Sequence, residues 1–102
     1  MYLSCSQKIN EGIVKNMHDT ILLNKISEEL KNICEANNIN KVKTFTVIVN
    51  HRSHVNEENL YEHLQNFDSK LVGKWTKINV QREDIQDQTA ILKSIQGEQN
   101  EN

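Results

Sequence analysis

The clearest pattern in this chain is a stripe of apolar residues between positions 19 and 38. Apolar side chains recur there every three or four residues, as one face of an α-helix requires, and Lys, Glu and Asn fill the other side. Asp19 or Thr20 can cap the first free N–H groups, and the Asn37–Asn38 pair tolerates the left-handed conformation that often ends a helix. The pattern therefore predicts a helix over residues 19–38, whose buried stripe is Leu22, Ile26, Leu30 and Ile33, widened by Leu23 and Cys34.

The next segment, VKTFTVIVN at residues 42–50, alternates in the way a strand does. β-branched residues dominate it, and such residues pack well on a pleated surface. We expect the face that carries Phe45, Val47 and Val49 to meet the helices. The face that carries Thr44 and Thr46 should be closer to water.

A second helical stripe follows at residues 56–68. Asn56 is a good N-cap, and the two glutamates after it favour the positive end of a helix. Val55 and Leu60 flank the cap at the positions of a hydrophobic staple. The pattern predicts a helix over residues 56–68 that ends before Gly73, with a stripe formed by Leu60, Leu64, Phe67 and Leu71.

Two further strands are predicted at residues 75–82 and 90–96, joined by a polar connection at 83–89. The strand–helix–strand unit should give parallel neighbours, because its crossover is long. The short connection between the last two strands favours an antiparallel pair. The fold class is therefore α+β, a small mixed three-stranded sheet with two helices on one face, in the order helix, strand, helix, strand, strand.

The two ends of the chain carry weaker patterns. Residues 1–16 hold a short apolar stripe interrupted by Gly12, and we interpret them as an N-terminal extension that is loosely ordered or adds one helical turn. Residues 17–97 should form a single domain, and residues 98–102 a polar, frayed tail. The core of such a domain is modest, so homodimerisation would help it.

Composition narrows the functional classes. The chain has 102 residues, with 12 Lys and Arg against 14 Asp and Glu, so the net charge is −2. A nucleic-acid binder usually shows a basic excess, so nucleic acid is not expected as a partner. No apolar run is long enough to cross a membrane, and the first residues lack the apolar core of a signal peptide. We therefore expect a cytoplasmic protein with no membrane partner.

Little in the sequence indicates catalysis. There is no Ser/His/Asp signature and no glycine-rich phosphate loop, so the chain is predicted not to be an enzyme. His51 and His54 frame the turn before the second helix without a nearby carboxylate, which favours solvated histidines over a metal site, and His63 should be partly exposed. The two cysteines, Cys5 and Cys34, form no Cys-x-x-Cys pair, so no zinc is expected.

Several short segments, in order, resemble a known family. Residues 17–19, Met-His-Asp, stand at the start of the first helix, and residues 53–61, SHVNEENLY, follow the first predicted strand. Together with the strands at 75–82 and 92–95, they resemble the metallochaperones that insert nickel into hydrogenase and urease. The resemblance covers residues 17–97. It implies nickel binding, and delivery of the metal to a maturation GTPase or an apo-enzyme.

The implied metal ligands are Met17, His18 and Asp19, where the family has Met-His-Glu at its free N-terminus. In that family the terminal amine, backbone amides and imidazole form a nitrogen set that suits Ni(II). The chain departs from the pattern in three ways. It lacks the family's zinc ribbon between the last two strands, Asn50-His51 replaces a Gly-Glu pair, and 16 residues precede Met17.

The 16 preceding residues leave two interpretations open. Met17 is the true start and residues 1–16 are an upstream read, in which case the domain is a nickel-binding metallochaperone-like protein. Alternatively the extension is real, and the domain is an interaction or regulatory module that keeps the fold without the metal. The sequence favours the first interpretation slightly, because the family-like region begins at Met17.

Overall fold

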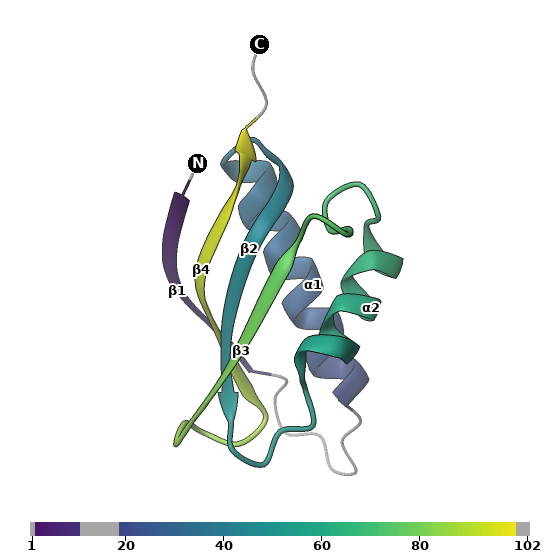
Figure 1. Ribbon diagram of the computed structural model, residues 1–102. Coiled ribbons are helices and arrows are strands. Elements are labelled where there is room, and N and C mark those ends of the chain that lie inside the picture. Colours follow the sequence, from purple (N-terminus) through teal and green to yellow (C-terminus); the bar gives the residue numbers. More distant parts are fainter. Residues whose placement is uncertain (1, 11–18, 100–102) are drawn as a thin grey trace.

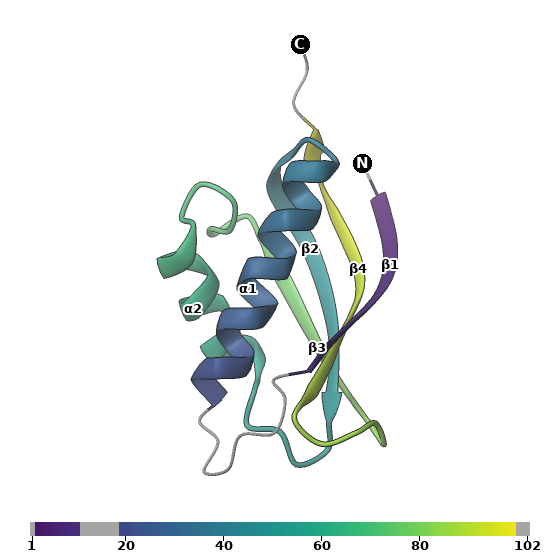
Figure 2. The same cartoon turned by 180° about the vertical axis from the view of Figure 1, so that it is seen from behind.

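The computed structural model describes the backbone of residues 2–10 and 19–99, with side chains from residue 21 onward (Figure 1). Six elements follow one another: β1 (Tyr2–Asn10), α1 (Asp19–Ala36), β2 (Ile39–Asn50), α2 (Glu57–Phe67), β3 (Lys77–Glu83) and β4 (Thr89–Gln99). The predicted order of helix, strand, helix, strand, strand is confirmed, as is a mixed three-stranded sheet made of β2, β3 and β4. Both helices lie on the same side of the sheet (Figure 2).

The N-terminal segment differs from its prediction. Residues 2–10 form neither a loose extension nor a helical turn, but a strand that pairs antiparallel with β4 and extends the sheet to the order β1-β4-β2-β3. Its register runs from Tyr2 opposite Gln96 to Asn10 opposite Thr89, with an irregularity between Ser4 and Gln7. Such a break shifts which residues share a face, so a strand of this kind lacks clean alternation in its sequence.

The pairing of the last two strands also differs from its prediction. β3 and β4 do not pair with each other, because both pair with β2, one on each side. β3 runs parallel to β2, as the crossover predicted, and β4 runs antiparallel to it. The connection over residues 84–88 therefore passes across the end of β2 (Figure 1). A short connection favours antiparallel strands, but it does not require that they be neighbours.

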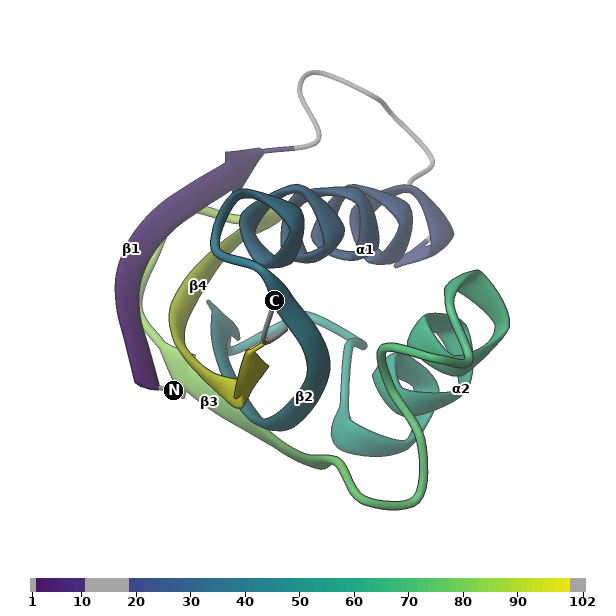
Figure 3. The ribbon, with the colours of Figure 1, turned by 90° about the horizontal axis from the view of Figure 1, so that it is seen from above.

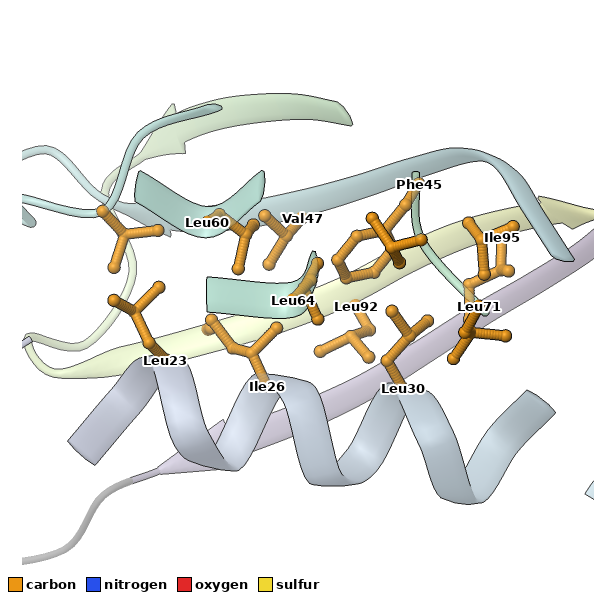
Figure 4. Close-up of a cluster of buried hydrophobic side chains, with 14 of the residues drawn as sticks. Leu23, Ile26, Leu30, Phe45, Val47, Leu60, Leu64, Leu71, Leu92 and Ile95 are labelled. Atoms are coloured by element: carbon orange, nitrogen blue, oxygen red, sulfur yellow. The ribbon is translucent and has the colours of Figure 1, made fainter. Parts of the chain in front are cut away.

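The core lies between the sheet and the helices. The predicted helical stripes supply eight of its 18 buried residues, and β2 contributes its Phe45 face (Figure 4). Cys34 is buried in this core as a small apolar residue, as predicted. Two stripe members differ, since Ile33 of α1 is only partly buried and Phe67 is 39% exposed at the last position of α2. The helix stops there, and Leu71 reaches the core from the turn that follows.

The opposite face of β2 is less wet than predicted. Thr46 and Ile48 are only 7% and 8% exposed, although both described helices lie on the other side of the sheet (Figure 2). β3 and β4 flank β2, and Asn79 of β3 donates a weak hydrogen bond of 3.5 Å to the hydroxyl of Thr46. Seen from above, the sheet is strongly curved, which draws neighbouring side chains together (Figure 3).

The helix ends follow local chemistry. Asn56 caps α2 as predicted: its side chain accepts from the backbone N–H of Asn59, and the Asn59 side chain accepts from the backbone N–H of Asn56. Val55 and Leu60, the predicted staple, are both fully buried. α1 ends at Ala36, and Asn38 takes the left-handed conformation with φ 57°. The C-terminal residues differ from prediction, because Glu98 and Gln99 belong to β4 and not to a frayed tail.

Candidate functional site

The structure describes only the last of the three residues of the predicted metal site. Met17 and His18 lie outside the described residues. Asp19 is the first residue of α1, with its backbone alone described. The nickel set implied by the resemblance therefore stays a prediction. Within the described part of the chain, no group of three His, Cys, Asp or Glu residues is placed to hold a metal ion.

The remaining histidines are dispersed. His51 and His54 are exposed in the turn and loop after β2, and the backbone carbonyl of His54 accepts from the Asn59 side-chain amide at 2.8 Å. His63 is half-buried on α2, and its Nε2 lies 2.7 Å from Oδ1 of Asn24 on α1. Its role is to join the two helices. The predicted solvated and packing roles of these residues fit these positions.

The most organised polar cluster links β3 to the loop that enters α2. The guanidinium of Arg82 donates to the backbone carbonyls of Ser53 and Val55, each at 2.7 Å. A planar guanidinium can reach two acceptors at once, which an ammonium group does less well. This clamp fixes the start of α2 against the strand. No sequence pattern predicted it, because Arg82 is 27 and 29 residues away from its acceptors.

Glu57, the first residue of α2, makes a second link to β3. Its carboxylate accepts a hydrogen bond of 3.1 Å from the backbone N–H of Val80. β3 is an edge strand in the described sheet, with β2 on one side only. The N–H of Val80 therefore points away from β2, and Glu57 occupies the place where a neighbouring strand would present a carbonyl.

A groove runs between α2 and this edge of β3. Its volume is about 440 Å³, and Glu57, Glu58, Tyr61, Thr76, Lys77 and Ile78 line it. Tyr61 and Ile78 are half-buried apolar residues packed against the core, so the floor of the groove is apolar. Two carboxylates and one ammonium group stand at its rim. It is open to solvent and combines an apolar floor with a free strand edge, which suits an extended polypeptide.

Two other hollows offer less. One of about 280 Å³ is polar and is lined by Asn50, His51, Arg52, Asp84 and Asp87. A smaller one of about 150 Å³ lies beside Cys34 between the ends of α1 and α2. Trp75, 42% exposed, does not open a pocket: its ring lies against Gly73, and the Lys41 ammonium sits 4.9 Å from the ring centroid. Neither hollow gathers the groups that a reaction would need.

Comparison with known proteins yields no family for this chain: no protein-family model matches it, and no curated protein matches it. Among the described helices, none is long and apolar enough to cross a membrane.

Proposed function

We propose that the chain is a non-enzymatic protein-interaction module. The observation that carries the proposal is β1, because residues 2–10 pair along β4 and complete one side of the sheet. A segment integrated in this way belongs to the domain, and in the full chain the nitrogen of Met17 is then an amide. An amide nitrogen inside a chain lacks the basic lone pair of a terminal amine, so the nickel set of the resembling family loses its amine donor and is weakened.

The module keeps the element order of the metallochaperone-like domain without its N-terminal site. Its binding surfaces are then the two sheet edges and the groove beside α2, which offer backbone groups and apolar area. Such surfaces suit an extended polypeptide, which can add to a strand edge and place apolar side chains in a groove. The protein partner is expected to bind without metal.

Purification of the full chain from its native host with a strong chelator present tests this proposal. A partner that stays bound in the chelator supports the module, and a partner that is lost with the metal contradicts it. The matched variant Arg82→Lys, which keeps the charge but loosens the clamp at the groove, should reduce recovery of that partner. An exposed change outside the groove, Glu35→Gln on α1, serves as the control.

A second candidate is the nickel-binding, metallochaperone-like function, in which Met17, His18 and Asp19 hold Ni(II) for a maturation GTPase or an apo-enzyme. The observation that favours it is the start of α1 at Asp19, directly after the Met-His pair, as the resembling family requires. His18 would bind as a neutral imidazole, so affinity should fall as pH drops through its titration.

Nickel titration separates the two candidates. For the interaction module, the full chain and its His18→Ala and His51→Ala variants should bind nickel equally weakly. For the nickel-binding candidate, His18→Ala should remove most of the affinity while His51→Ala leaves it unchanged. The second pattern would overturn the interaction module as the primary function.

A further inference from the structure

The free edge of β3 is complementary to itself. β3 has the sequence KINVQRE, and when it is laid antiparallel against a second copy with Val80 at the centre, Lys77 falls opposite Glu83. The arrangement is two-fold symmetric, so the same opposite-charge pair occurs twice. Asn79 falls opposite Gln81, which sets one amide side chain against another. Every residue of the strand then has a partner.

The orientation of the backbone fits this register. The N–H of Val80 points away from β2, since it donates to Glu57. Residues two apart along a strand point the same way, so the backbone groups of Ile78 and Arg82 are also directed outward. Antiparallel strands exchange both hydrogen bonds at alternate residue pairs. Centred on Val80, those pairs are Val80 with itself and Ile78 with Arg82, and all of them use outward groups.

The side chains fall on matching faces as well. Side chains alternate along a strand, so Lys77, Asn79, Gln81 and Glu83 share the face on which Asn79 meets Thr46, although Lys77, at the start of the strand, also borders the groove. Ile78 and Val80 lie on the helix face beside the groove. In the paired arrangement, Arg82 of the second copy lies opposite Ile78, while its guanidinium keeps its contacts with Ser53 and Val55 of its own chain. The charge complementarity of the pairing therefore comes from Lys77 and Glu83.

Other registers are poorer. In any antiparallel pairing, the outward backbone groups of one copy must face the outward backbone groups of the other. The alternative two-fold pairings therefore have their centre at residue 78, 79, 81 or 82. Each of these leaves part of the strand without a partner, and none sets Lys77 opposite Glu83. The register centred on Val80 alone pairs the whole strand and both charges.

We propose that this chain forms a two-fold symmetric homodimer through antiparallel pairing of β3 with β3 of a second copy, and that Glu57 competes with this pairing. In the monomer its carboxylate holds the Val80 N–H, and in the dimer a carbonyl of the second copy takes its place. The inference goes beyond the proposed function, because it assigns the β3 edge, one of the binding surfaces named there, to a second copy of this chain. An interface built on a seven-residue strand is small, so the dimer should be weak and concentration-dependent.

Charge reversal tests the register. In Lys77→Glu two carboxylates face each other at each end of the pairing, and in Glu83→Lys two ammonium groups do. Each variant alone should therefore raise the dimer Kd by about tenfold or more. Mixed together, the two variants form only opposite-charge pairs and should form a heterodimer at least as tight as the wild-type homodimer. Sedimentation equilibrium over about a hundredfold range of concentration measures all of these.

The competing role of Glu57 is tested separately. Glu57→Ala frees the Val80 N–H and should lower the dimer Kd relative to Glu58→Ala, which removes the same charge from the same helix turn but no such contact. Circular dichroism confirms that each variant is folded. A wild-type chain that stays monomeric throughout, a mixture that forms no heterodimer, or capture of a different polypeptide at β3 by a monomeric chain would each overturn the proposal.

Discussion

β3 and β4 flank the same central strand, yet they are held in different ways. β4 lies between β1 and β2, and its Ala90, Leu92 and Ile95 are fully buried against the core. β3 has one neighbour, and its Ile78 and Val80 are only partly buried. Polar contacts from Glu57 and Arg82 supplement its packing. The β4 side of β2 therefore depends on apolar burial, and the β3 side depends in part on a few directed polar contacts.

Truncation of one apolar residue on each side of β2 should give the largest difference in stability. Leu92→Ala empties a fully buried site and should lower the free energy of unfolding by about 2–5 kcal/mol. Ile78→Ala on β3 should cost about 1 kcal/mol, since water already reaches that side chain. Urea denaturation of both variants measures the difference. Equal losses would show that β3 is as much a core strand as β4.

Gly97 within β4 and Gly73 before β3 allow the same substitution to be compared on the two sides of β2. A Cβ at Gly97 of β4 would meet the backbone carbonyl of Lys41, which cannot move without disturbing β2. Gly97→Ala should therefore cost about 1–3 kcal/mol. At Gly73, before β3, the obstacle is the exposed ring of Trp75, which can swing away, so Gly73→Ala should cost less. A larger loss at Gly73, seen by thermal unfolding, would contradict this view.

Removal of the α2 cap should weaken the β3 side through the helix that supports it. Asn56→Ala deletes the side chain that accepts from the Asn59 N–H and should cost about 1 kcal/mol. Asn66→Ala, at an exposed position on the same helix, is the control and should change stability little. The urea midpoints of the two variants, compared at an unchanged m value, measure the change in stability. A loss of the same size in both variants would show that the effect does not come from the cap, since alanine itself favours the helix.

Arg82→Lys should have a smaller effect on the β3 side. The positive charge stays, but a lysine cannot reproduce the fork that donates to Ser53 and Val55, so we expect a loss of about 0.5–1.5 kcal/mol. Hydrogen exchange should rise in the loop before α2 and remain unchanged in β4. Increased exchange across β4 as well would mean that the two sides are not independent.

The smallest effect is expected at the surface pair between β2 and β4. The Lys43 ammonium lies 3.3 Å from a carboxylate oxygen of Glu98, but both side chains are about half exposed, at 52% and 49%. Lys43→Ala should change stability by less than about 1 kcal/mol, and high salt should erase the difference. A large, salt-resistant loss would indicate that polar contacts also support the β4 side.

Local sequence patterns predicted the elements well where one residue period covers a whole element. The stripe of α1 and the Phe45 face of β2 are such cases, and so is the Asn56 cap, because its partners lie within one helical turn. β4 shows where the patterns fail. Leu92 and Ile95 are three residues apart yet share the core face, since Lys93 is an extra residue at an irregularity opposite β2. Strict alternation would have placed them on opposite faces.

The candidate site was predicted less well, for a related reason. Met17, His18 and Asp19 were found because they are adjacent in sequence, and they remain a prediction. The groove beside α2 combines residues from two elements, with Glu57 and Val80 separated by 23 positions. No spacing rule connects such residues. Only the parallel placement of β3 beside β2 brings its free edge to the start of α2.

Neighbouring residues and composition were enough to predict the helices, the three later strands and a net charge of −2. The pairing that joins β1 to the sheet, the place of β2 between β3 and β4, and the contact of Glu57 with the edge of β3 appear only in the folded chain. Strand pairing depends on backbone groups that every residue carries, so side-chain patterns specify which segments are strands but not which of them are neighbours.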